Sequence, residues 1–203
     1  MICAMVLAAG LSRRMGTQKL LLPFGGKTVI THIVDQIAES TVDETYVVVG
    51  HEGKRASREL SGRDVSIVSN PDYESGMLSS VRCGLAALPQ ECGVVLVALG
   101  DQPSVTSRLI DEMVRSFAQT EEKILVPIYN GRRGHPVIFS LGYRDEIMTR
   151  YDNVGLRGLL HAHPEDVFEL SISTSAVLSD MDYPQDYQRE LGSIKRSNHG
   201  GED

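Results

Sequence analysis

Residues 6–19 read Val6-Leu7-Ala8-Ala9-Gly10-Leu11-Ser12-Arg13-Arg14-Met15-Gly16-Thr17-Gln18-Lys19, an apolar run that breaks into small residues and then three cations. Gly10 and Gly16 allow a positive φ angle or a close backbone approach, so main-chain N–H groups can face phosphate oxygens. Arg14 and Lys19 add mobile positive charge. The stretch predicts a buried strand followed by a loop for a phosphate-rich ligand, the alternative being a surface loop with solvated arginines.

The spacing of this loop excludes two common phosphate motifs. Five residues separate Gly10 from Gly16, whereas a Walker A loop has four residues between its glycines and then Lys-Ser/Thr. The dinucleotide pattern GxGxxG is also missing from it. The loop therefore indicates a nucleotide triphosphate site of another kind.

Composition bounds the class of protein. The chain has 203 residues, 41% of them hydrophobic, enough for one domain with a substantial core. We predict a single domain over residues 1–192 and a disordered polar tail over 193–203. The net charge of −7 argues against binding to nucleic acid or an anionic membrane.

Cysteine usage and the first residues bear on location. Cys3, Cys83 and Cys92 lack metal-ligand spacing and imply no disulfide framework. Residues 1–10 are apolar but too short to span a bilayer. We therefore expect a cytoplasmic protein.

Short apolar runs alternate with helical patterns, which predicts a three-layer α/β/α, Rossmann-like fold with a mostly parallel sheet. Strands are expected at 2–8, 46–49, 65–68, 94–99, 124–128, 137–140, 168–172 and 176–178. Helices are expected at 28–39, 78–88, from a cap at Ser104 or Thr106 to 119, at 143–150, 155–162 and 185–191.

Two distant segments are expected to converge. The apolar run Val94–Leu99 is typical of a central parallel strand and ends directly at Gly100-Asp101-Gln102-Pro103. Ligands of open α/β sheets bind beyond the carboxyl ends of the strands. If the first strand and this one are neighbours, the loop of residues 10–19 and Asp101 face the same crevice.

The pattern changes after residue 128. Asn130-Gly131 is a turn signal, and Arg132-Arg133-Gly134-His135-Pro136 leads into the strand expected at 137–140. This arrangement predicts an antiparallel excursion from the parallel sheet. The insertion lies in a position to cover the crevice.

Motifs spread over residues 1–187 resemble the molybdenum-cofactor nucleotidyltransferases, and among them the cytidylyltransferase branch. They are Leu7–Gly16 with Lys19 and Leu20–Pro23, Asn70-Pro71 with Gly76 and Ser79-Ser80, Gly100–Pro103, Arg133–Pro136, Gly155–Arg157 with Leu159-Leu160, and Asp182-Tyr183-Pro184 with Asp186. The first motif alone is similar to many nucleotidyltransferases of this GT-A-type fold, and the combination is more specific.

Three residues favour the CTP-using branch. Ala9, with Gln102-Pro103 after the aspartate, resembles that branch, whereas the guanylyl branch typically has a second glycine at the position of Ala9. One position departs from the pattern, because the residue after Asp182 is commonly threonine and is Tyr183 here.

The resemblance implies transfer of CMP from CTP to the terminal phosphate of molybdopterin, the molybdenum cofactor, with release of pyrophosphate. Asp101 is implied as the main Mg²⁺ ligand, which suits a metal that takes few carboxylates and completes its octahedron with phosphate oxygens and water. Asp182 is the candidate second ligand, or an ordinary turn aspartate before Pro184. Arg14 is assigned to the β- and γ-phosphates and Lys19 to the α-phosphate.

The implied site divides into three parts. The catalytic residues are Lys19, Arg14 and Asp101. The nucleotide-binding residues are Leu7, Ala8, Ala9, Gly10, Ser12, Arg14, Lys19, Asn70, Gly76, Ser79, Ser80 and Gly100. The acceptor-binding residues are Gly134, His135, Pro136 and Arg157.

Some of these residues also have a purely structural interpretation. Ser79 and Ser80 either meet the cytosine edge or cap a helix. Asn70 either meets the base or sugar or holds the turn before Pro71. His135 either pairs with the acceptor phosphate or is a structural histidine.

The resemblance also implies partners. The product would serve molybdenum hydroxylases such as xanthine dehydrogenase, an enzyme of purine catabolism, and the protein would dock with them. The rival enzymes use GTP, or a sugar phosphate or alcohol phosphate as acceptor. The rival outside enzymes is a carrier that binds molybdopterin and delivers it to an apo-hydroxylase.

Overall fold

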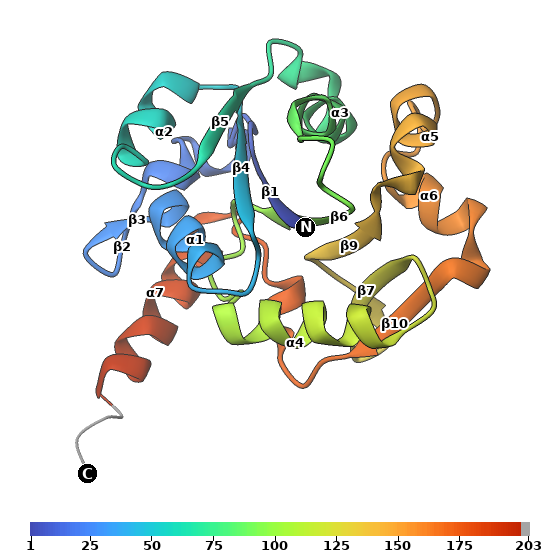
Figure 1. The fold of residues 1–203 in the computed structure, drawn as a ribbon. Helices are drawn as coiled ribbons and strands as arrows, with labels where there is room; N and C mark the ends of the chain where they lie inside the picture. Colours follow the sequence, from blue (N-terminus) through green and yellow to red (C-terminus); the bar gives the residue numbers. More distant parts are fainter. Residues whose placement is uncertain (200–203) are drawn as a thin grey trace.

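A mixed sheet with helices on both faces organises the chain (Figure 1). The computed structural model describes residues 1–199. The eight-stranded sheet has the order β10-β7-β9-β6-β1-β4-β5, with β8 beside β7. Its strands are β1 (Ile2–Ala8), β4 (Glu44–Val49), β5 (Ser66–Ser69), β6 (Val94–Leu99), β7 (Ile124–Tyr129), β8 (Arg132–Arg133), β9 (Val137–Ser140) and β10 (Val167–Ser171).

The sheet is parallel except around β9 and the short β8, which pairs antiparallel with β7. β1 pairs in parallel with both β4 and β6, so the first strand and the expected central strand are neighbours. β9 lies between β6 and β7 and is antiparallel to both. The predicted fold class, a mostly parallel sheet with one antiparallel excursion, is confirmed.

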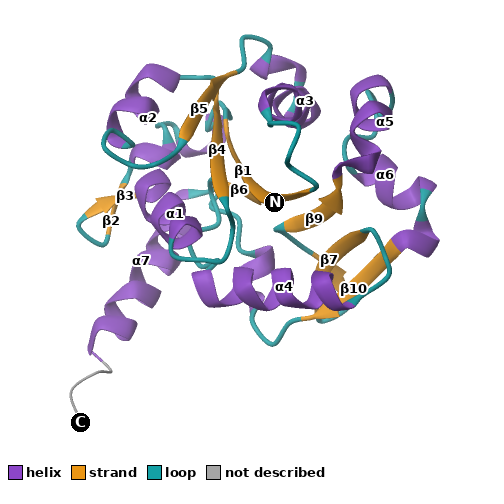
Figure 2. Ribbon diagram, in the orientation of Figure 1, coloured by secondary structure: helices purple, strands orange, loops and turns teal. Residues whose placement is uncertain are grey.

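Helices form the two outer layers (Figure 2). One face packs against α1 (Val29–Ala38), α2 (Gly53–Glu59) and α4 (Ser107–Gln119). The other face packs against α3 (Met77–Ala87), α5 (Arg144–Thr149) and α6 (Arg157–Ala162). α7 (Pro184–His199) extends from the first face, beside the small hairpin of β2 (Pro23–Phe24) and β3 (Lys27–Thr28).

The amphipathic pattern explains the helices that the sequence predicts. The apolar stripe of α1 is fully or almost fully buried, and it consists of Val29, Ile30, Ile33, Val34 and Ile37. α4 begins at a Thr106 cap, whose hydroxyl accepts from the Leu109 N–H at 3.3 Å. Of the two expected caps, Thr106 is therefore the one used.

Two local predictions are wrong. Residues 176–178 form part of a 3₁₀ helix, Ser175–Leu178, and not a strand, because the Thr174 hydroxyl caps the turn by accepting from the Ala176 N–H. The tail is helical through His199, since Ile194 packs against the hairpin at Gly25. Residues 200–203, the rest of the predicted tail, lie outside the described residues.

The segment after β8 is held against the 3₁₀ helix by a close backbone approach. The His135 N–H donates to the Val177 carbonyl at 2.9 Å. A Cβ on Gly134 would lie 2.1 Å from the same oxygen. Gly134 is therefore required by space.

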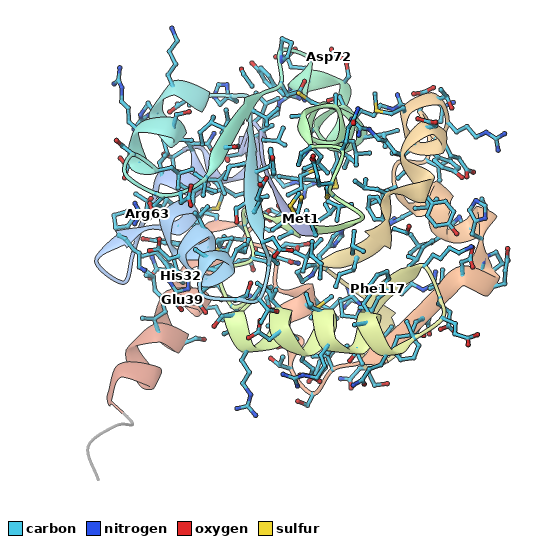
Figure 3. All side chains as sticks on the ribbon, viewed as in Figure 1. Met1, His32, Glu39, Arg63, Asp72 and Phe117 are labelled. Atoms are coloured by element: carbon cyan, nitrogen blue, oxygen red, sulfur yellow. The ribbon has the colours of Figure 1, made fainter. Side chains whose placement is uncertain are left out.

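The loop after β6 is anchored from α1. His32 (labelled in Figure 3) donates from Nε2 to the Pro103 carbonyl at 3.1 Å, and its ring packs edge-on against Phe24. Burial lowers the pKa of His32, and the charge of Lys27 lowers it further. His32 is thus a half-buried imidazole whose neutral form is favoured.

None of the helices in residues 1–199 combines the length and the hydropathy that crossing a bilayer requires.

Replacing Gly134 by alanine is expected to lower the free energy of unfolding by about 1–3 kcal/mol, because the methyl group overlaps the Val177 carbonyl. Urea denaturation measures the change. The matched control is Gly142→Ala, where the nearest atom to an added Cβ is 3.5 Å away, and its expected effect is within about 0.5 kcal/mol. Equal stability of the two variants would contradict the steric account.

The pKa of His32 predicts a pH dependence of stability. Its folded pKa lies below the ordinary value of 6.5, so its stabilisation is complete above that value and is lost as the pH falls through the lower folded pKa. We expect the free energy of unfolding to fall less steeply between pH 7 and pH 5 in His32→Asn than in the wild type. Comparison at pH 7.5 isolates the lost packing, and identical slopes would rule out the linkage.

Candidate functional site

The loop after β1 offers free backbone donors at the carboxyl edge of the sheet. Ser12 has φ 50° and Gly16 has φ 67°, both in the left-handed region, and the Met15 N–H closes a turn on the Ser12 carbonyl at 3.0 Å. Within residues 1–199, the N–H groups of Gly10, Leu11 and Ser12 donate to no acceptor. Clustered free N–H groups of this kind are suited to an anion.

Two cations of this loop reach carboxylates from distant segments. Lys19 Nζ donates to Asp101, which follows β6, and lies 3.1 Å from Asp182 Oδ1, just before α7. Arg14 Nη1 lies 2.7 Å from Asp182 Oδ2. The side chain of Lys19 is 12% exposed and that of Arg14 is 63% exposed, so solvent screens the arginine pair far more.

The electrostatics of Lys19 follow from its neighbours. Burial alone would lower the pKa of Lys19, but the charges and hydrogen bonds of Asp101 and Asp182 outweigh that effect and raise it. The ammonium is therefore held charged between two carboxylates.

A short segment, Asp180–Asp182, is fixed beside Asp101. The Met181 N–H donates to the Asp101 carbonyl at 3.0 Å, and the Met181 side chain is fully buried. Gln102 Nε2 donates to Asp180 Oδ1 at 2.7 Å. Burial raises the pKa of Asp180, and the charge of Asp101 raises it further.

A first cavity of about 510 Å³ opens between these elements. Its lining includes eight of the predicted nucleotide-site residues, Leu7, Ala9, Gly10, Ser12, Arg14, Lys19, Gly76 and Ser80, together with both predicted metal ligands, Asp101 and Asp182. The structure therefore brings together segments that are up to 175 positions apart, from Leu7 to Asp182.

Four predicted nucleotide-site residues lie behind this lining. Asn70 is buried and donates to the hydroxyls of Ser79 and Ser80, at 3.0 Å each. Ala8 and Gly100 belong to the packed junction of β1 and β6, where the Gly100 N–H donates to the Leu7 carbonyl. Asn70 and Ser79 thus hold the turn that places Ser80 in the cavity.

A second cavity, also about 510 Å³, adjoins the first, and Met77 lines both. Three of the four predicted acceptor residues, Gly134, His135 and Arg157, line it. Its other lining residues are Met77, Val126, Arg133, Val137, Val154, Gly155, Leu156, Leu160 and His161. The fourth, Pro136, is buried beside them. The wall is largely apolar, with arginine and histidine side chains around it.

The pKa of His135 is affected by charged residues of both cavities. Burial lowers its pKa, the charge of Asp101 opposes that shift, and the charge of Arg157 adds to it. His135 therefore feels one charged group of each cavity. Its side chain makes no hydrogen bond in the part of the chain that the structure describes.

The carboxylates of Asp101 and Asp182 fit a divalent cation. The ammonium of Lys19 already lies between them, so the site accommodates positive charge at that position. Carboxylate oxygens are ligands that Mg²⁺ and Mn²⁺ prefer. One or two carboxylates, together with phosphate oxygens and water, are a usual ligand set for such an ion, so the two side chains fit this role.

Several residues around the first cavity were missed by sequence reasoning. Tyr73 and Asp180 line the cavity, and Gln18 is buried behind it. Tyr73 comes close because Gly50 has no side chain, since a Cβ there would lie 2.6 Å from that of Tyr73. The sequence signal for Asp180 was its place two residues before Asp182, the candidate metal ligand. No sequence pattern indicated Gln18.

Known proteins of similar sequence and structure act on nucleotides. The chain is 27% identical to the molybdenum cofactor cytidylyltransferase of Escherichia coli (strain K12) over 188 residues, which are 92% of this chain and 93% of that protein. A nucleotidyl transferase from Methanothermobacter thermautotroptrophicus superimposes with a TM-score of 0.85 at 27% identity, over 98% of this chain and 99% of that one.

A further solved structure bears on the metal. It is Rv0371C of Mycobacterium tuberculosis H37Rv in complex with manganese, with a TM-score of 0.80 and 27% identity, over 95% of this chain and 98% of that one. The MobA-like NTP transferase domain matches the chain from residue 4 to residue 167, across the loop after β1 and the acidic end of β6, and the chain is therefore a member of that family.

Proposed function

We propose that this nucleotidyltransferase moves CMP from CTP to the terminal phosphate of molybdopterin and releases pyrophosphate, with Mg²⁺ as cofactor. The observation that carries the proposal is the position of Lys19 between Asp101 and Asp182, in the cavity that the loop residues with free N–H groups also line. Such a site places positive charge and metal ligands where a triphosphate reacts.

The reaction needs no protein nucleophile. An oxygen of the acceptor phosphate forms a bond to the α-phosphorus of CTP, the bond from that phosphorus to the bridging oxygen breaks, and its electron pair leaves with pyrophosphate. Lys19 faces the α-phosphate, where charge grows, and Arg14 faces the β- and γ-phosphates. The free N–H groups of the loop hold the triphosphate in line.

Asp101 and Asp182 are the residues that would hold Mg²⁺. When bound, the ion neutralises phosphate oxygens and orients them. Met181, buried and bonded to the Asp101 backbone, keeps the two carboxylates on facing segments.

The choice of CTP rests on the residues that approach the base. Ala9 adds a methyl group to the lining of the cavity compared with the glycine of the guanylyl branch, and Ser80 lines the same cavity. The cytidylyltransferase from Escherichia coli aligns over nearly the whole chain. These observations support a pyrimidine over the larger guanine.

The second cavity suits the proposed acceptor. Its apolar wall of Val126, Val137 and Leu160 offers a surface for the flat face of the pterin rings, and Arg157 supplies charge for a phosphate. Through Met77 it adjoins the cavity of the triphosphate. We further propose that the dinucleotide product passes to hydroxylases such as xanthine dehydrogenase, an enzyme of purine catabolism. The proposal includes a cytoplasmic location for the protein.

Asp101→Asn tests the catalytic role. We expect pyrophosphate release to fall at least about 10- to 100-fold, a loss typical even of groups that only orient a metal ligand, with an unchanged thermal melting curve. The assay combines molybdopterin with CTP, GTP or ATP and identifies the dinucleotide by mass spectrometry. Turnover with GTP alone would refute the CTP assignment, and cofactor delivery without pyrophosphate release would favour a carrier.

Arg157→Gln tests the acceptor cavity. We expect the KM for molybdopterin to rise about 10-fold, the loss of a charge-assisted hydrogen bond, while the KM for CTP stays constant. The matched control is Arg132→Gln, because Arg132 is exposed on β8 and lies outside the lining of the cavity. A rise in the KM for CTP instead would remove Arg157 from the acceptor site.

A further inference from the structure

A polar side chain is buried beneath the loop after β1. Gln18 is 8% exposed, although its neighbour Thr17 is exposed and the loop around it faces solvent. A buried amide is costly unless its donors and acceptor are satisfied. The partners of Gln18 therefore show what it holds in place.

All the partners of the Gln18 amide belong to the wall of the cavity or to the strand end behind it. Gln18 Oε1 accepts from the Ser12 hydroxyl at 2.6 Å. Gln18 Nε2 lies 3.3 Å from the carbonyl oxygens of both Gly10 and His51 and donates to them. One amide thus ties the loop after β1 to the end of β4.

These bonds orient the free N–H groups of the loop. In a trans peptide the C=O and the next N–H point in opposite directions. Because the Gly10 carbonyl is turned toward Gln18, the Leu11 N–H is turned away from it, and Leu11 lines the cavity. In the preceding peptide, the His51 N–H binds the Ala9 carbonyl at 3.3 Å, which orients the Gly10 N–H in the same manner.

The Ser12 hydroxyl extends the effect to Lys19. It donates to Gln18 and accepts the Lys19 N–H at 3.2 Å. This bond joins the left-handed turn at Ser12 to the backbone of the residue whose ammonium pairs with Asp101. Gln18 itself is not part of the cavity lining, so its influence on a ligand passes through these neighbours.

We propose that Gln18 is a positioning residue: it turns the Leu11 N–H toward the triphosphate of the nucleotide, and it holds His51, whose own N–H orients the peptide of the Gly10 N–H. The proposal rests on the proposed function for the identity of the nucleotide, and on the geometry of the loop for the role of Gln18.

The test compares Gln18→Leu, which keeps the volume but removes all three hydrogen bonds, with the wild type. We expect the dissociation constants of CTP and of inorganic tripolyphosphate, measured by calorimetry, to rise about 10-fold. At saturating CTP the kcat stays within about twofold, while KM rises with the dissociation constant. Gln18→Glu, which retains an acceptor for Ser12 but opposes two carbonyls with a carboxylate, is expected to bind at least as weakly.

The control is Gln36→Leu on α1, whose amide binds Glu39 and the Ser107 N–H away from the loop. It is expected to leave both dissociation constants unchanged. If Gln18→Leu binds tripolyphosphate as tightly as the wild type and differs only in a lower melting temperature, the role proposed for Gln18 is overturned. The proposed function would then stand. Conversely, the wild type could bind tripolyphosphate without transferring CMP while Gln18→Leu binds it about 10-fold more weakly. That result would support the role of Gln18 and refute the proposed function.

Discussion

The attraction between the Lys19 ammonium and the carboxylates of Asp101 and Asp182 is the interaction on which the site depends. It joins the loop after β1, the loop after β6 and the segment before α7. The first two lie close together because β1 and β6 are neighbours in the sheet, and the third lies beside them at the carboxyl ends of these strands. Burying such charges costs solvation energy, and a hydrophobic replacement is often at least as stable. Stability alone therefore does not account for the cluster, and the proposed binding of a metal ion and a triphosphate gives it a reason.

Under the proposed function, the same cluster would link the binding of the nucleotide to the binding of the metal ion. A triphosphate that draws Lys19 and Arg14 toward its oxygens leaves the two carboxylates without their cations, and a divalent ion that binds the carboxylates frees those cations for phosphate. Each ligand therefore removes a cost that the other would otherwise bear, and such coupling is reciprocal. Nucleotide and metal are thus expected to bind better together than apart, for reasons visible in the protein alone.

The sequence predicted what long periodic or apolar segments determine. β1, β6 and α1 follow from their patterns, and the convergence of the loop after β1 with Asp101 follows from the rule for parallel sheets. The pattern did not predict α2, because Ala56 is its one buried residue. Gln18 was missed because its role lies in hydrogen bonds to two carbonyls, which no residue spacing encodes. The assigned roles of the site residues stay predictions.

Tyr183, which departs from the family pattern, lies at a position with room for its larger side chain. The ring of Tyr183 is half exposed, and the Arg14 guanidinium carbon lies 5.7 Å from its centroid. An exposed contact of this kind contributes about 0.5–1 kcal/mol. The Tyr183 N–H still donates to Asp186, as the turn before α7 requires. Tyr183 therefore contacts the more exposed of the two cations, so that Arg14 has a second partner beside Asp182, while Lys19 is paired with Asp101 and Asp182.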